Sequence, residues 1–332
     1  MRIAADHTDV IHEETSANLA MRLVKGRRRA VRTFLRYASR YRRNLRKIWG
    51  EALDQFLAIA IAAEEAGSMF NEEHLETVAA DNDILFETLA GLHARACRTA
   101  FEVHYLLSGG FPMGALARCR TLHELTVTMS LLQKFGRKPQ HLDLAERFRL
   151  HDVVVNYRDA LAYQETCEKT GYDPYSDEEM AEMRADRDAL IDRFGQEFKS
   201  DNGWATIITG KTRPTFLDME ELAGFAHLRG FYKWGSHEVH AGSKGWRLNT
   251  SKHGEDLLVH SGYMNTGLAD PGHLALISLL NCCIYFLFCL DAPEPQEIAI
   301  VVALQHLIDA AGDEFLRAHE MLEGPVKPIA EQ

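Results

Sequence analysis

Two helical segments of the chain carry polar side chains at positions where a buried helix would have apolar ones. In the first, residues 113–135, the side chains of Arg120, His123 and Glu124 share about one third of the helical wheel. Arg120 and Glu124 are four residues apart and can form an ion pair. An imidazole next to such a pair can transfer protons or stabilise developing charge. The pattern therefore favours either a catalytic site or a buried ion-pair network that fixes helix register.

The second segment, predicted as one helix over residues 218–240, changes from apolar to polar along a single face. Its polar end carries Arg229, Tyr232, Lys233, Ser236, His237 and His240. Such a change is typical of a core helix whose end opens into a polar cleft. His240 would lie at the helix C-terminus, where protonated imidazole is favoured, and a histidine that titrates near pH 7 suits acid–base catalysis. The simpler interpretation is that His240 only caps its helix.

Helical periodicity dominates the rest of the chain, with Gly and Pro marking the breaks. The predicted helices cover a basic N-terminal segment and residues 76–107, 113–135, 141–169, 176–198, 218–240, 274–290 and 294–320. Residues 199–217 and 241–273 are expected to be irregular, and Trp204–Thr209 is the one modest strand candidate. The sequence thus predicts an all-α fold, a multi-helix bundle with a long antiparallel hairpin over residues 76–135 and with Ser176 as a helix N-cap.

The charge is distributed unevenly along the chain. Residues 22–47 contain twelve Lys or Arg and no acid, although the whole chain has a net charge of −11. We therefore expect a basic helical arm over residues 1–70 and a bundle domain over 71–332 that carries the polar cleft. The arm would contact an RNA backbone through four arginines. These are Arg27, Arg28, Arg29 and Arg32. Docking of the arm on the acidic body is the alternative.

The cysteines, the N-terminus and the longest apolar segment indicate where in the cell the protein is located. The six cysteines form no Cys-x-x-Cys pair, and we expect them to be buried free thiols in a reducing compartment. The N-terminus lacks the apolar core of a signal peptide, and residues 274–290 are short for a membrane span. These features predict a cytoplasmic protein that makes no membrane contact.

Metal and nucleotide chemistry find little support in the sequence. His237 and His240 are three residues apart, which does not match a zinc-protease helix, and His93 with Cys97 has no evident further ligands. Phosphate-binding and dinucleotide fingerprints are absent from the sequence. We therefore expect neither a metal nor a cofactor.

Two stretches carry a resemblance to a known family. Ser108-Gly-Gly-Phe-Pro-Met-Gly-Ala-Leu-Ala-Arg-Cys-Arg-Thr-Leu-His-Glu124 and Tyr232-Lys-Trp-Gly-Ser-His-Glu-Val-His240 look like the two hallmark helices of an uncharacterised bacterial family, the domain of unknown function five-six-seven-seven. The resemblance extends over residues 75–290. It implies a helical fold and leaves the activity open.

More distantly, the chain resembles HEPN domains, helical bundles whose active members are metal-independent ribonucleases with an Arg, a spacer of four to six residues, and a His. Three stretches invite comparison. They are Arg98–His104, Arg118–His123 and Lys233–His240. Arg118 and His123 lie about 140° apart on their helix and cannot converge on one phosphate. The third stretch has the expected location near a helix end, with Lys in place of Arg.

The HEPN resemblance implies an RNA endonuclease of the toxin or antiviral-defence type that acts through attack by the ribose 2′-hydroxyl. His240 would act as acid or base, and Lys233, Arg229 or Arg120 would stabilise the charge on phosphorus. The remaining candidates would orient or bind the substrate. Among them, Ser236, His123 and Glu124 are expected to belong to the catalytic group, with Ser236 orienting His240 or the phosphate and Glu124 holding Arg120. The expected substrate-binding residues are Arg229, Tyr232, His237, Arg98 and Glu102. A homodimer and a regulatory protein partner are further implied, and a non-catalytic binding or scaffold module using the same cleft is the alternative.

Overall fold

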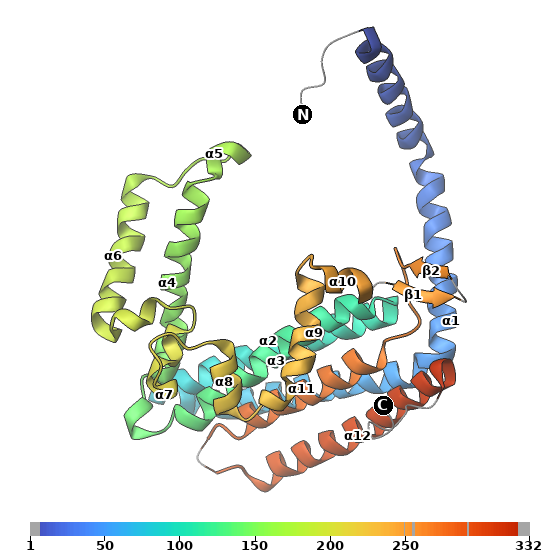
Figure 1. Cartoon of the computed structure of the whole chain (residues 1–332). Coiled ribbons are helices and arrows are strands. Elements are labelled where there is room, and N and C mark those ends of the chain that lie inside the picture. The colour runs from blue at the N-terminus through green and yellow to red at the C-terminus, as the bar shows by residue number, and fades with distance from the viewer. Residues whose placement is uncertain (1–6, 249, 254–255, 291, 325–332) are drawn as a thin grey trace. The chain divides into compact units, whose positions relative to one another are not determined.

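The computed structural model describes residues 7–248, 250–253, 256–290 and 292–324, and it confirms the all-α fold (Figure 1). The helices are α1 His7–Asp81, α2 Ile84–Gly109, α3 Pro112–Phe135, α4 Leu144–Gln164, α5 Cys167–Thr170, α6 Asp177–Phe194, α7 Thr206–Thr209, α8 Phe216–Ala223, α9 Arg229–Val239, α10 Ser243–Leu248, α11 Ala269–Leu287 and α12 Pro295–Glu323. Two short antiparallel strands, β1 Thr250–His253 and β2 Asp256–Val259, form a hairpin that the sequence did not predict.

The chain divides into two compact units, residues 1–50 and residues 51–332. The boundary falls before the expected one at 70/71. The first unit holds the N-terminal part of α1, and the second holds the bundle. The outer ends of the two predicted domains, residues 1–6 and 325–332, lie outside the described residues, as does most of the N-terminal stretch examined for a signal peptide.

The core of the second unit is formed by α2, α3 and α11, which pack against one another, with α12 packed on α11. The C-terminal part of α1 joins this core through Phe56 and Phe70, whose rings contact Phe315 and Phe286. The six cysteines are free and buried, as the sequence predicts. In the described residues, α11 alone is long and apolar enough to cross a membrane, and 61% of its apolar window is buried inside the bundle. A largely buried apolar helix is typical of a core element.

The predicted hairpin is confirmed, but its first helix begins later than expected. Glu76 belongs to α1, and the chain breaks at Asn82, which has a φ of 51°. Asparagine tolerates this left-handed conformation, and the side chain of Asp83 then accepts a hydrogen bond from the backbone N–H of Phe86 and caps α2. At the other end, Gly110 takes a φ of 79° and reverses the chain into α3.

The helix predicted over residues 218–240 is in fact two helices, α8 and α9. Gly224 has a φ of 91°, which ends α8, and a single 3-10 turn at Ala226–Leu228 leads into α9. A capping box between Thr215 and Asp218 starts α8. The break has a consequence for the site, because it lets side chains of α8 and α9 approach each other from different directions.

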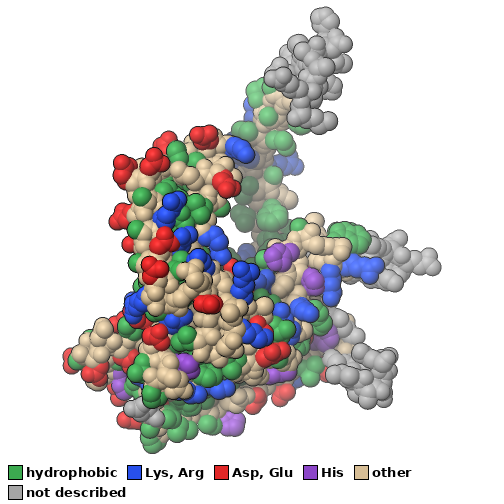
Figure 2. All heavy atoms as spheres, turned by 60° about the vertical axis from the view of Figure 1, so that its left-hand side comes forward, with side chains coloured by type: hydrophobic (Ala, Val, Ile, Leu, Met, Phe, Trp, Pro, Cys, Tyr) green, Lys and Arg blue, Asp and Glu red, His purple; other side chains and the backbone are tan. Residues whose placement is uncertain are grey.

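A pair of helices, called the α4–α6 arm below, extends from the bundle and consists of α4 packed against α6 (Figure 1). Ser176 caps α6 with a capping box to Glu179, as predicted. The stretch Trp204–Thr209 is helical, so its prediction as a strand was wrong. Residues 165–192 of the α4–α6 arm include ten Asp or Glu, and Figure 2 shows acidic side chains gathered at the outer end of this arm. This surface repels other anions.

Candidate functional site

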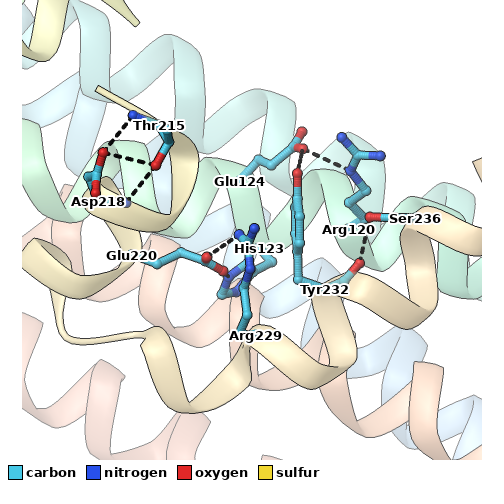
Figure 3. A network of polar contacts seen from close by, with 9 residues as sticks. All are labelled: Arg120, His123, Glu124, Thr215, Asp218, Glu220, Arg229, Tyr232 and Ser236. Atoms are coloured by element: carbon cyan, nitrogen blue, oxygen red, sulfur yellow. Dashed lines mark hydrogen bonds and ion pairs between the residues drawn. The ribbon is translucent and has the colours of Figure 1, made fainter. Parts of the chain in front are cut away.

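A buried carboxylate joins three helices at the centre of the candidate site (Figure 3). Glu220 of α8 is fully buried, and its Oε1 lies 2.7 Å from Nε2 of His123 on α3. Its Oε2 accepts a hydrogen bond from the guanidinium of Arg229 at the start of α9. Burial lowers the pKa of His123 despite the nearby carboxylate. The imidazole is therefore neutral at pH 7, and it donates the Nε2 hydrogen to Glu220.

A second ion pair lies beside the first and includes the tyrosine of α9. Oε1 of Glu124 accepts from Nε of Arg120 at 2.9 Å and from the hydroxyl of Tyr232 at 3.1 Å. Burial and the Glu124 charge both raise the pKa of Tyr232, so its hydroxyl stays protonated. The guanidinium carbons of Arg120 and Arg229 each lie 4.9 Å from the centre of the Tyr232 ring. These contacts form one polar cluster, defined here as Arg120, His123, Glu124, Glu220, Arg229 and Tyr232.

The close approach of α9 to α3 depends on a glycine. A Cβ atom at Gly235 would lie 2.9 Å from the backbone oxygen of Leu116 and 3.1 Å from Cβ of Arg120. Both distances are too short for a side chain, so Gly235 allows the two helices to pack backbone to backbone. This contact brings Tyr232 and Arg229 to the polar side chains of α3.

We expect Gly235→Ala to lower the free energy of unfolding by about 1–3 kcal/mol, because the added methyl group overpacks the α3–α9 contact. The matched control is Gly230→Ala on the same helix, where a Cβ atom meets nothing within 4 Å. That change should be neutral or slightly stabilising, since alanine favours a helix over glycine. Urea denaturation measures both variants, and equal stabilities for the two would contradict this account of the packing.

Three predicted residues of α9 lie away from the polar cluster. Lys233, His237 and His240 are spaced by four and three residues, so they occupy one face of α9, about 180° from Gly235. Lys233 and His240 are exposed, and His237 is partly exposed. His240 is the C-cap residue of α9, as the simpler interpretation of the sequence expected. The structure thus separates the candidates into a buried cluster against α3 and an exposed stripe.

The exposed stripe continues onto α10 and includes aromatic side chains that the sequence reasoning missed. Trp234 and Trp246 are 42% and 58% exposed, which is unusual for rings of this size. Lys244 and Arg247 of α10 are exposed as well. A Cβ atom at Gly245 would lie 2.5 Å from the backbone oxygen of His237, so α10 packs closely on α9. We define the α9–α10 surface by its residues, which are Lys233, Trp234, His237, His240, Lys244, Trp246 and Arg247.

A signal for this surface was present in the sequence. Residues 222–253 contain five Lys or Arg and a single acid, within a chain whose net charge is −11. Local charge could therefore have drawn attention to Lys244 and Arg247. Glu220 could not have been found in this way, because its partners come from α3 and α9 and only the fold brings them together.

A narrow pocket lies between the polar cluster and the core. Arg120, His123 and Tyr232 line one side, and Cys119, Leu274 and Ser278 are among its other walls. Its volume is about 20 Å³, which holds one or two water molecules. The pocket can therefore accept no more than the tip of a ligand without movement of its walls.

The remaining predicted residues belong to other parts of the fold. Glu102 of α2 lies 4.0 Å from Nε of Arg98 and 2.6 Å from Nη2 of Arg118, and it links α2 to α3. Arg118 and His123 therefore contact different helices, as their spacing predicts. The four arginines predicted to contact RNA are exposed on α1.

The predicted His93–Cys97 pair lies in the core. His93 is buried, and its Nε2 is 3.4 Å from Sγ of Cys283 on α11. Burial raises the pKa of both thiols, so they stay protonated. Among the described residues, no group of three or more His, Cys, Asp or Glu side chains is arranged to hold a metal ion.

Comparison with known proteins gives one match. Residues 86–256, just over half of the chain, match the model of a family described as a family of unknown function, DUF5677. The matched range runs from α2 to β2 and contains both the polar cluster and the α9–α10 surface. No curated protein and no solved structure matches the chain.

Proposed function

The chain belongs to the family of unknown function DUF5677, and we propose that it binds single-stranded RNA on the α9–α10 surface. The observation that carries this proposal is the combination of two exposed tryptophan rings with exposed cations on two packed helices. Proteins that bind single strands stack bases on aromatic side chains and place Lys or Arg along the phosphates. The α9–α10 surface offers both kinds of contact.

The charge distribution supports an anionic ligand at this surface. Residues 222–253 carry five Lys or Arg and one acid, whereas residues 165–192 of the α4–α6 arm carry ten acids. An RNA strand is attracted to the first region and repelled by the second. The electrostatic attraction should weaken as salt is added, because binding releases the cations condensed on the strand.

The polar cluster has a supporting role in this proposal. Glu220 and Glu124 fix Arg229 and Tyr232 of α9 against α3, and the narrow pocket beside them leaves no room for a nucleotide. A rigid α9 holds its exposed side chains in place, which reduces the entropy lost when the ligand binds. Arg120, His123 and Glu124 are accordingly positioning residues, in place of the catalytic role expected from the sequence.

RNA cleavage is a second candidate function, favoured by the two imidazoles beside Lys233 on one exposed face. In that reaction His240 removes the proton of the 2′-hydroxyl, and the 2′-oxygen attacks phosphorus. His237 gives a proton to the leaving 5′-oxygen, and the products are a 2′,3′-cyclic phosphate and a 5′-hydroxyl. Lys233 stabilises the charge on the phosphoryl oxygens. A homodimer, a regulatory partner, a role in antiviral defence and a cytoplasmic location remain predictions of the HEPN resemblance and the composition.

Removal of the cations tests RNA binding. In the triple variant Lys233→Gln, Lys244→Gln and Arg247→Gln, the affinity for a single-stranded oligoribonucleotide should fall, measured by fluorescence anisotropy. The slope of log affinity against log salt should become less negative by about 2, since each phosphate contact contributes about 0.7. Trp234→Ala with Trp246→Ala should weaken binding by roughly tenfold per ring and leave the salt slope unchanged.

The matched control removes three exposed cations elsewhere, with Arg95→Gln, Lys169→Gln and Lys199→Gln. This variant should bind RNA like the wild type. Equal weakening by the control, or wild-type binding by both surface variants, would rule out the α9–α10 surface as the RNA site.

Product analysis then separates binding from cleavage. If the wild type converts the oligoribonucleotide to a 2′,3′-cyclic phosphate in the presence of a metal chelator, His240→Ala should abolish the product and retain RNA binding. Binding without any product in the wild type would reject the nuclease and retain the binding module.

A further inference from the structure

The N-terminal part of α1 carries a continuous stripe of basic side chains, which is not part of the α9–α10 surface. Eight of the twelve cations in residues 22–47 lie within an arc of about 80° on the helical wheel. They are Arg22, Lys25, Arg29, Arg32, Arg36, Arg40, Arg43 and Lys47, and all eight are exposed. Like charges spaced by three or four residues destabilise a helix that has no counter-charge.

The same helix has an apolar stripe next to the basic one. Residues 15–37 are exposed throughout, a length of about 35 Å. Leu19, Leu23, Val31 and Leu35 are between 54% and 67% exposed, and they lie within an arc of about 160° outside the basic stripe. Apolar side chains exposed over such a length indicate a surface that meets an apolar environment.

Only some ligands can contact both the basic stripe and the apolar stripe. A second copy of the helix could cover the apolar stripe, but the pair would then hold twice the uncompensated positive charge, since residues 22–47 contain no acid. A nucleic acid could neutralise the basic stripe, but it would leave Leu19, Leu23 and Leu35 in water. The ligand that matches both stripes is apolar on one side and anionic along its edge.

We propose that residues 15–37 lie on the surface of a bilayer that contains anionic lipids, whereas Ala38 and Leu45, farther along the same arc, are buried in the protein. The apolar stripe enters the boundary of the acyl chains, and the basic stripe contacts the lipid phosphates. Helices with Lys and Arg on one face and Leu or Phe on the other bind membranes in this way and lie in the plane of the interface. Arg27, which falls within the apolar arc, reaches the headgroups with its long side chain. This proposal departs from the expectation of no membrane contact, which rested on the lack of a membrane-spanning segment, because a helix that lies on the surface does not need to span the bilayer.

Vesicle flotation with the full chain tests this proposal. The protein should float with vesicles of equimolar phosphatidylglycerol and phosphatidylcholine, and it should stay unbound with phosphatidylcholine alone. The basic variant Arg29→Gln, Arg32→Gln, Arg36→Gln and Arg40→Gln should bind more weakly by on the order of a hundredfold or more, since each cation near an anionic surface strengthens binding about fivefold. The apolar variant Leu19→Gln, Leu23→Gln and Leu35→Gln should lose most of its binding as well.

A control for net charge changes four exposed cations outside α1, with Arg95→Gln, Lys169→Gln, Lys199→Gln and Arg213→Gln. It should float like the wild type. Three results would overturn the proposal. One is equal binding to neutral vesicles, and another is wild-type binding by the apolar variant. The third is no vesicle binding by the wild type, and a dimer or an RNA complex that the α1 variants disrupt would then identify the other ligand.

Discussion

Glu220→Ala is expected to lower the free energy of unfolding by about 3–5 kcal/mol, because it removes the acceptor shared by two donors in the interior. The Glu220 side chain is fully buried, and His123 is 8% exposed. Without the carboxylate, Arg229 keeps a partly buried positive charge and His123 loses the acceptor for its Nε2 hydrogen. The desolvation of both groups is then no longer compensated. Chemical denaturation followed by circular dichroism measures this loss.

The adjacent residue gives a matched control. Glu221 is exposed, and Glu221→Ala should leave stability nearly unchanged. In the double variant Glu220→Leu and Arg229→Met, the loss should be smaller than in Glu220→Ala, since no buried charge is left unpaired. Equal losses in the two Glu220 variants would show that the ion pair is not the source of the effect.

Acidification should destabilise the protein through His93. Burial lowers the pKa of His93 to about 4, and its neighbours Cys97 and Cys283 have thiols that stay protonated because burial raises their pKa. The unfolded chain binds a proton at this histidine below its ordinary pKa of 6.5, whereas the folded chain does so only below about 4. Stability is therefore fully present above pH 6.5 and falls as the pH decreases toward 4. The loss from this group amounts to about 3 kcal/mol.

The variant His93→Leu isolates this contribution. The free energy of unfolding, measured at several values between pH 4 and pH 6.5, should change less steeply with pH than in the wild type. His123 and His151 keep a smaller acid dependence in both proteins, since burial lowers the pKa of each. His227→Gln, at an exposed histidine, should retain the full slope. An unchanged slope in His93→Leu would contradict a neutral, buried imidazole.

Local signals in the sequence predicted many of the elements. The Ser-Gly-Gly-Phe-Pro break predicted the α2–α3 hairpin, and Ser176 with Glu179 predicted the start of α6. The lack of a Cys-x-x-Cys pair predicted buried free thiols. Two errors in helix bounds arose where a single residue took a left-handed conformation inside a helical pattern. Asn82 ends α1, and Gly224 separates α8 from α9, although the periodicity continues across both.

Five of the six residues of the polar cluster were predicted, whereas Glu220 and the arrangement of the cluster were not. Sequence spacing identified Arg120, His123 and Glu124 on one helix, and it placed Tyr232 and Arg229 on another. Spacing gives only the direction of a side chain about its own helix axis. Which face of α9 meets α3 is decided by the close approach at Gly235, and this contact turns Lys233 and His240 outward.

The sequence by itself determined the helical class, the family, the hairpin and the uneven charge, because these follow from periodicity, turn residues and composition along a continuous chain. The tertiary structure decided that Glu220 is the common acceptor of His123 and Arg229, and that Trp234 and Trp246 face water. The physical reason is that burial and ion pairing depend on which surfaces pack together. A packing interface joins residues far apart in sequence, and no local pattern encodes their contact.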